Sequence, residues 1–172
     1  TLSIKLENLK SNKKIIIIYR NNGGPEKNQK ICAFRKKCKI KNFKFYIANN
    51  FKLAKECKAD GIYISSYNKK NYFNDNFNLI GSAHSFKEIY EKIKQGCTTV
   101  ILSRLFKTSY KDKKSYLGVV KFNLIRNNYS INLIPLGGIK DNNLLQLNLV
   151  NSKGFCLFSE IKKKPVISNR LF

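Results

Sequence analysis

The chain has 172 residues, 42 % of them hydrophobic, which is enough for one domain with its own core. Its apolar runs are short, the longest being Ile15–Ile18, so we expect no membrane-spanning helix of about 20 residues and no membrane partner. The 34 Lys and Arg residues against 10 Asp and Glu residues give a net charge of +24. Nearly all of this excess is lysine scattered along the chain, whereas base and phosphate readers favour arginine. We therefore expect no specific nucleic-acid partner.

The predicted strands are short apolar segments that alternate with helical patterns. Most are continuous apolar runs, which suit a parallel sheet buried on both faces. In chain order they are Lys14–Arg20, Phe43–Ala48, Gly61–Ser65, Asn78–Ser82, Thr98–Ser103, Ile131–Leu136 and Gly154–Phe158.

Helices are predicted between these strands. Pro25 opens the first, which has Ile31, Phe34 and Cys38 on one face. Asn50 caps the second, which carries a stripe of Phe51, Leu53, Ala54 and Cys57. The third begins with a capping box of Ser85 and Glu88, continues with Phe86, Ile89, Tyr90 and Ile93 at helical spacing, and ends at Gly96. The last contains Leu144, Leu145, Leu147 and Leu149.

Strand–helix alternation on this scale predicts an α/β fold. Seven strands fit a (β/α)8 TIM-type barrel that lacks its first strand in this chain, and an open doubly wound sheet is the alternative. Long polar loops after the strands, such as Lys107–Ser115, favour the barrel, because barrel sites lie at the carboxyl ends of the strands. We expect residues 1–172 to form a single barrel domain.

The segment Ile131–Lys140 (INLIPLGGIK) is the strongest local signal of a binding site. An apolar strand ends at Gly137 and Gly138, and a helical segment follows with Asp141 or Asn142 as its expected cap. Glycines allow the backbone to approach an anion, and a helix N-terminus offers free N–H groups. The alternative is a tight turn that binds nothing.

The cysteines have no zinc-binding spacing and lie in apolar contexts: Cys32, Cys38, Cys57, Cys97 and Cys156. We therefore predict buried free thiols in a reducing cytoplasm. His84 is the only histidine, which excludes a His-rich metal site and a histidine dyad.

Five segments in register resemble the thiamine phosphate synthase/TenI family: ADGIYIS, IGSAHSFKEI, ILSRLFKTSYK, IPLGGIKDNN and GFCLFSEI. The resemblance covers roughly Ile15 to Ile161 and implies a (β/α)8 barrel. It also implies an enzyme of thiamine biosynthesis, a transferase that joins an aminopyrimidine methyl diphosphate to a thiazole phosphate with loss of diphosphate. Such a protein holds Mg²⁺ and diphosphate, stabilises the leaving charge and anchors the thiazole phosphate.

The resemblance assigns site residues by position. It places Gly137, Gly138, Phe158 and Ser159 at the substrate phosphate, and Arg20 and Lys111 as catalytic residues at the diphosphate. It places Ser82, Thr108, Asn49 and Asn68 on the diphosphate and pyrimidine side. His84 is either a ligand contact or a polar group packed at a strand–helix junction.

The chain also departs from the family pattern. Asn49 and Asn68 stand where the family has its magnesium aspartates, and Ala48 replaces a pyrimidine-binding asparagine. Neutral amides attract Mg²⁺ less than carboxylates do, so recruitment of Mg²⁺ by the protein is expected to be weak, although Lys69 and Lys70 could neutralise charge there. Arg104 replaces the histidine of the TenI thiazole tautomerases. The alternative function is therefore a catalytically degenerate relative that binds a phosphorylated small molecule.

Overall fold

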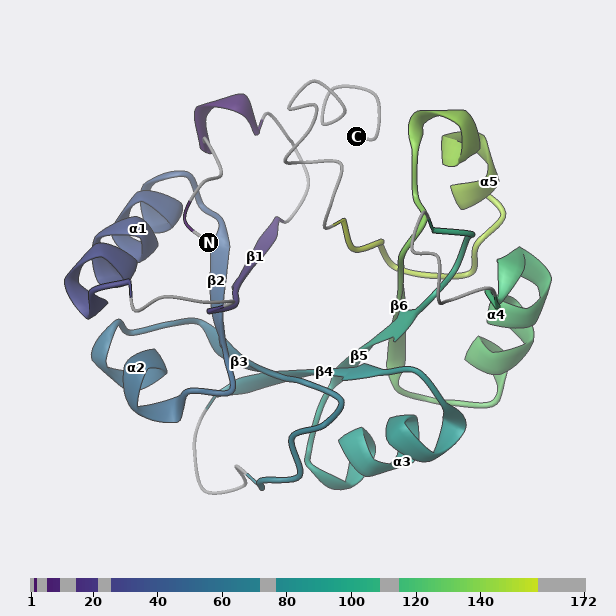
Figure 1. Cartoon of the computed structure of the whole chain (residues 1–172), viewed down its shortest axis with the longest axis horizontal. Helices are drawn as coiled ribbons and strands as arrows, with labels where there is room; N and C mark the ends of the chain where they lie inside the picture. The colour runs from purple at the N-terminus through teal and green to yellow at the C-terminus, as the bar shows by residue number, and fades with distance from the viewer. Residues whose placement is uncertain are drawn as a thin grey trace.

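The computed structural model describes residues 2, 6–9, 15–21, 26–71, 77–108 and 115–157. Within them, six parallel strands pair in the order in which they occur in the sequence. The strands are β1 (Ile16–Tyr19), β2 (Lys44–Ala48), β3 (Gly61–Ile64), β4 (Asn78–Ala83), β5 (Thr99–Ser103) and β6 (Asn132–Leu136). The sheet is curled, and the helices lie along its outer side (Figure 1).

The described residues also form five α-helices and two short 3-10 helices, of which the first 3-10 helix precedes β1 and the others connect or follow the strands. The α-helices are α1 (Asn28–Ile40), α2 (Phe51–Glu56), α3 (Phe86–Lys94), α4 (Gly118–Asn127) and α5 (Leu144–Leu147). The 3-10 helices are η1 (Leu6–Asn8) and η2 (Asp141–Asn143). No helix within the described part of the chain is long and apolar enough to cross a membrane.

The continuous apolar runs form strands that are buried on both faces, as predicted. All four residues of β3 are buried, and three of the five in β2 are. The outer face of the sheet packs against the helices, with Phe45, Ile62 and Val100 fully buried. The inner face forms a second, smaller cluster around Tyr46, Tyr63, Ile80 and Ile101. Two packed faces are the pattern of a sheet that curls toward a barrel.

Three of the predicted helix boundaries are confirmed. The Asn50 side chain accepts a hydrogen bond from the Leu53 N–H (3.0 Å), and the Ser85 hydroxyl accepts one from the Glu88 N–H (3.3 Å). Gly96 follows the end of α3 with φ +79°. These local signals were readable because caps depend on residues within one helical turn.

Other predictions for the helices were wrong. α1 begins at Asn28 rather than at Pro25, which lies outside the described residues. α3 contains Phe86, Ile89, Tyr90 and Ile93 as predicted, but of these four only Ile89 is buried, and Phe86 and Tyr90 are more than half exposed. α5 ends at Leu147, which leaves Leu149 outside the helix.

The cap of the last helical segment also differs from the prediction. Neither Asp141 nor Asn142 precedes the first turn; that position belongs to Lys140. The Lys140 N–H donates to the Asn143 side-chain oxygen (2.8 Å), and the Asn143 amide group donates to the Gly138 carbonyl (2.8 Å). Asn143 therefore fixes the turn from inside the helical segment.

The cysteine prediction was wrong for one pair. Cys32 of α1 and Cys57 at the end of α2 form a disulfide, so these two outer helices are covalently joined. Cys38, Cys97 and Cys156 are free thiols, as predicted. Burial raises the pKa of Cys38 and Cys97 to about 11, which keeps both thiols protonated and unreactive near neutral pH.

The α/β class and the parallel sheet are confirmed, and the described strands make about half of a barrel. The strand predicted over Gly154–Phe158 is reduced, within the described residues, to one parallel bridge between Leu136 and Cys156. The sheet is not doubly wound, since consecutive strands are neighbours throughout and no strand order reverses.

Candidate functional site

The parallel order brings the carboxyl ends of all six strands to one edge of the sheet. The predicted site residues Arg20, Asn49, Ser82 and Gly137 follow or end four of these strands, so they share that edge. Polar residues at this edge are the usual origin of a binding site in a curled parallel sheet, because the loops there are free of the packing between sheet and helices.

Arg20 and Ser82 are brought toward each other through one tyrosine on the inner face. The Arg20 guanidinium carbon lies 5.6 Å from the centre of the Tyr63 ring. Burial raises the pKa of Tyr63, and the neighbouring Ser82 side chain and Arg20 act in the opposite direction. Tyr63 therefore neighbours both of these residues predicted for the diphosphate side.

Asn49 and Asn68 meet at the ends of β2 and β3. The Asn49 side-chain oxygen accepts hydrogen bonds from the Asn68 amide group (2.9 Å) and from the Ser65 N–H (3.0 Å). The Asn49 amide group donates to the Ser65 hydroxyl (2.7 Å) and the Tyr67 hydroxyl (3.1 Å). We call these four residues the amide corner. Asn49 adopts φ +56°, a left-handed conformation that asparagine tolerates better than most residues.

The amide corner does not fit Mg²⁺. Both lone pairs of the Asn49 oxygen are already used, and the Asn68 oxygen accepts the Lys70 N–H (2.9 Å). A hard divalent cation prefers carboxylate oxygens, and neither residue supplies one. Among the described residues, no group of three or more His, Cys, Asp or Glu side chains is placed to hold a metal ion.

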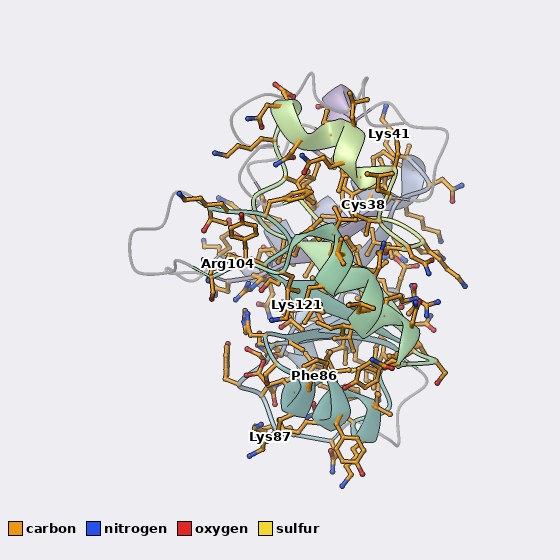
Figure 2. All side chains as sticks on the ribbon, turned by 90° about the vertical axis from the view of Figure 1, so that its right-hand side faces the viewer. Cys38, Lys41, Phe86, Lys87, Arg104 and Lys121 are labelled. Carbon is orange, nitrogen blue, oxygen red and sulfur yellow. A yellow bond between two sulfur atoms is a disulfide. The ribbon has the colours of Figure 1, made fainter. Side chains whose placement is uncertain are left out.

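The ends of β4 and β5 carry a second set of polar contacts. His84 Nδ1 lies 2.7 Å from the Ser103 hydroxyl oxygen, and the His84 N–H donates to the Glu88 carboxylate (2.6 Å). Arg104 follows Ser103 in the chain and donates a hydrogen bond to the Thr108 hydroxyl (3.2 Å). The Arg104 side chain also lies close enough to Gly137 to exclude a side chain at that position. In Figure 2, Arg104 lies above Phe86 and Lys87, two labelled residues of α3. Arg104 and the Ser103 hydroxyl thus lie at the edge of the site. The family pattern in the sequence singled out the position of Arg104, whereas Ser103 was not identified from the sequence.

Gly137 and Gly138 both need to be glycine, for a structural reason. Their φ angles are +100° and +71°, and a Cβ on Gly138 would lie 2.4 Å from the Phe106 carbonyl oxygen. The turn is therefore packed directly against the backbone that follows β5. This close approach, rather than helix geometry, is what the Gly-Gly pair provides, since η2 and the four-residue α5 replace the regular helix that was predicted.

A cavity of about 540 Å³ opens beside this turn. It lies between the backbone after β5 and the segment of η2 and α5, and both Thr108 and Gly138 line it, although the sequence assigned these two residues to different sides of the site. Lys107 and Lys140 also line it and are exposed at the surface. These two lysines do not stand out in the sequence, because so many lysines occur in the chain. The remaining lining residues are Phe106, Tyr116, Asn142, Asn143 and Gln146.

Three predicted site residues, Lys111, Phe158 and Ser159, lie outside the described residues. The chain just before Phe158 is described, and it runs beside β6. The Cys156 N–H donates to the Pro135 carbonyl (2.9 Å), in parallel pairing next to Leu136. Residues 154–157 therefore run along β6, which ends at Leu136 just before the Gly137–Gly138 turn.

The described residues thus form a curled parallel sheet with a polar edge at the carboxyl ends of its strands and a cavity lined in part by two lysines. Comparison with known proteins specifies the family. The family model described as thiamine monophosphate synthase (TMP-TENI) matches residues 4–161. The chain belongs to this family.

Relatives in the family are distant in sequence. The chain is 24 % identical over 160 residues to the thiamine-phosphate synthase of Dictyoglomus turgidum, a match that covers 88 % of this chain and 72 % of that protein. It is 26 % identical over 154 residues to the thiamine-phosphate synthase of Prochlorococcus marinus strain AS9601, covering 85 % of this chain and 44 % of the relative. The chain thus spans less than half of this second relative.

Solved structures show the same fold. The thiamine phosphate pyrophosphorylase of Pyrococcus furiosus superposes with a TM-score of 0.72 at 15 % identity, covering 99 % of this chain and 90 % of that one. The thiamine phosphate pyrophosphorylase of Bacteroides thetaiotaomicron gives a TM-score of 0.53 at 15 % identity, covering 92 % and 97 % of the two chains. At this identity the likeness concerns the fold.

Proposed function

We propose that the protein is a thiamine phosphate synthase that joins an aminopyrimidine methyl diphosphate to a thiazole phosphate and releases diphosphate. The observation that carries the proposal is the family match over residues 4–161. The curated relatives named thiamine-phosphate synthase favour this enzyme over a catalytically degenerate relative. We propose further that residues 1–172 form one domain and that the complete fold is the (β/α)8 barrel.

The proposed reaction transfers the aminopyrimidine methyl group from a diphosphate oxygen to the thiazole nitrogen. The bond between the pyrimidine methylene carbon and the diphosphate oxygen breaks, and its electron pair leaves with the diphosphate. The thiazole nitrogen then donates its lone pair to that carbon, so the new C–N bond forms without any oxidant or reductant. The protein's tasks are to stabilise charge on the leaving diphosphate and to orient the thiazole nitrogen.

The residues divide between two regions in this proposal. Arg20 and Lys111 neutralise the leaving diphosphate and Ser82 orients it, while Thr108, which also lines the cavity beside Gly138, orients it from the border between the two regions. The cavity beside Gly138 holds the thiazole phosphate, with main-chain groups of Gly137 and Gly138 and, from outside the described residues, Phe158 and Ser159. Lys107 and Lys140 add positive charge to this cavity. Asn49 and Asn68 shape the diphosphate and pyrimidine side through the hydrogen bonds of the amide corner.

The partner in this proposal is a phosphorylated small molecule, with no specific nucleic acid. We also propose a cytoplasmic location, as expected for this biosynthetic step. The Cys32–Cys57 disulfide is unusual for that location, because disulfides are uncommon in a reducing cytoplasm.

A coupling assay with both precursors tests the proposal. We expect thiamine phosphate from the wild-type protein, detected by chromatography, and a loss of about 100-fold in turnover for Arg20→Met, since one preorganised charge at a leaving group contributes on that order. The variant Asn49→Asp, Asn68→Asp is assayed beside them with MgCl2. No product from the wild type, together with product from this double variant, would show a decayed site and favour the degenerate alternative.

A further inference from the structure

Lys92 is the only charged side chain that is fully buried among the described residues. It lies on α3, and its aliphatic part crosses the outer face of β4 at Gly81. A Cβ on Gly81 would lie 2.8 Å from the Lys92 Cγ atom, so the missing side chain of Gly81 makes the room for this lysine. The charged end of the side chain lies between the end of α3 and the loop that follows β3.

The buried amino group is held by main-chain and amide oxygens. Lys92 Nζ donates to the Asn68 carbonyl (2.8 Å) and to the Gln95 side-chain oxygen (2.7 Å). The Gln95 amide group donates in turn to the Asn68 carbonyl (3.0 Å) and the Lys70 carbonyl (2.8 Å). We call Lys92 and Gln95 the α3 clamp. Both residues are almost entirely buried, so the clamp acts inside the protein and not at its surface.

Burying an ammonium group costs free energy because the charge loses its contact with water, and the same loss lowers the pKa of the group. Desolvation lowers the pKa of Lys92, and Lys69 acts in the same direction, while the neighbouring Cys97, Glu91 and Glu88 oppose the shift. Burial of a charge is tolerated only where hydrogen bonds compensate it, and here they are made to Gln95 and the loop. A methionine of similar length would fill the same space without this cost, so filling space does not account for a lysine at this position.

Hydrogen bonds connect the α3 clamp to the candidate site. It fixes the main chain of Asn68, whose side-chain amide group donates to the Asn49 oxygen (2.9 Å). Asn49 in turn holds Ser65 through both of its side-chain atoms. A displacement of the Asn68 main chain would therefore break the amide corner, although Lys92 itself does not reach the edge of the sheet.

The charge around the amide corner favours an anion. Lys69, Lys70 and Lys92 belong to this region, and Glu91 is the carboxylate that pairs with Lys69. The carboxylates expected for a divalent cation are replaced by Asn49 and Asn68. An ammonium group bonded to the Asn68 carbonyl would also repel a divalent cation placed at the Asn68 side chain, because the repulsion is strong at short distance and low dielectric.

We infer that Lys92 is a positioning residue, which holds the amide corner as a diphosphate-binding surface that needs no protein-bound Mg²⁺. This inference rests on the proposed function and extends it, since it states how the diphosphate side works in this chain. The positive charge is supplied by lysines, one of them built into the core, in place of a metal ion held by carboxylates.

The test is calorimetric titration of the full chain with inorganic diphosphate, once in EDTA and once in MgCl2. We expect wild-type affinity in EDTA within threefold of that in MgCl2. We expect Lys92→Met to bind diphosphate at least tenfold more weakly. Lys87→Met is the matched control, because Lys87 is exposed on the same helix (Figure 2) and its loss removes the same charge; we expect less than a twofold change. Wild-type binding only in MgCl2, or equal binding by Lys92→Met, would overturn the inference.

A second ligand separates positioning from general damage. Titration with the thiazole phosphate, which the proposed function assigns to the cavity beside Gly138, should give unchanged affinity in Lys92→Met. Equal weakening of both ligands would mean a global defect and would also overturn the inference. A wild-type protein that binds neither ligand would refute the proposed function itself, an outcome distinct from loss of the inference alone.

Gln95→Met keeps the test decisive if Lys92→Met does not fold. This variant retains the Lys92 bond to Asn68 but loses the Gln95 donors to Asn68 and Lys70. We expect diphosphate affinity to fall at least threefold, with thiazole phosphate affinity unchanged. Unaltered diphosphate affinity in a folded Gln95→Met protein would count against the clamp.

Discussion

The two regions that the sequence marks for ligand binding are built in different ways. At the ends of β2 and β3, Asn49 and Asn68 are closed on each other by hydrogen bonds and are supported from within by Lys92. At the ends of β5 and β6, the Gly137–Gly138 turn borders an open cavity of about 540 Å³ with exposed lysines. The contrast shows that one edge of a single sheet can carry a preformed rigid surface and an open pocket for a ligand.

The largest effect should come from the tight packing of the open region. Gly138→Ala forces a Cβ to within 2.4 Å of a backbone oxygen at φ +71°, and we expect a loss of about 3 to 5 kcal/mol in the free energy of unfolding. Gly118→Ala is the control, because Gly118 has φ +70° but no atom within 4 Å of the place that a Cβ would take. It should lose only about 1 to 2 kcal/mol. Urea denaturation measures both, and equal losses would mean that close packing is not the reason for glycine.

The next effect concerns the disulfide that joins α1 to the end of α2. The Cys32–Cys57 disulfide closes a loop with a sequence separation of 25, so Cys32→Ala, Cys57→Ala should lower the free energy of unfolding by about 3 kcal/mol. Denaturation of the wild type with and without reductant should give the same difference, while the double variant should not respond to reductant. A wild type that is insensitive to reductant would contradict a structural role for this bond.

A smaller effect should follow from removing charge in the open region. Lys107→Met, Lys140→Met should weaken inorganic phosphate or thiazole phosphate binding by about tenfold, since two cations line the cavity but remain exposed to solvent. Lys121→Met, Lys153→Met removes the same charge outside the residues that line the cavity. If the two double variants lose affinity equally, the attraction comes from the net charge of the chain and not from the cavity.

The smallest effect should be a pH dependence in the closed region. The pKa of Lys92 is lowered in the folded protein, so the unfolded chain binds more protons in the range between that lowered pKa and the ordinary value of 10.5. The stability of the wild type should therefore rise with pH relative to Lys92→Met, by less than about 1 kcal/mol between pH 8 and pH 10. Thermal denaturation of both proteins across this range measures the difference in their stability. The neighbouring groups Glu88, Glu91, Lys69 and Cys97 are present in both proteins, so their own titration cancels in that difference. A constant difference would show that Lys92 titrates normally.

Much of the fold was predictable, because it depends on local patterns. Continuous apolar runs indicated the parallel strands, and the caps at Asn50 and Ser85 indicated the starts of α2 and α3. The buried face of α3 was not predictable, because Phe86 and Tyr90 look more suitable for a core than Lys92. Only the packing of α3 against β4 shows that Gly81 leaves room for a lysine stem.

The sequence indicated which positions belong to the candidate site, but it revealed less of the structural reason for each residue. Gly138 was singled out for anion binding, but the structure adds that a side chain there would collide with the Phe106 backbone. The contact between Asn49 and Asn68 depends on strand register, and the disulfide joins residues on two separate helices, so sequence spacing contains neither. The roles of Arg20, Ser82 and Thr108 stay predictions.

The uninterrupted strand order has a consequence for synthesis on the ribosome. Each of β2 to β6 pairs with the strand made immediately before it, so every new strand finds its partner already present when it leaves the exit tunnel. The amide corner, made of residues 49–68, can therefore assemble before β4 emerges. The bond from Lys92 to the Asn68 carbonyl can form only after α3 has been made, so the amide corner gains this support later than the pairing of β2 with β3.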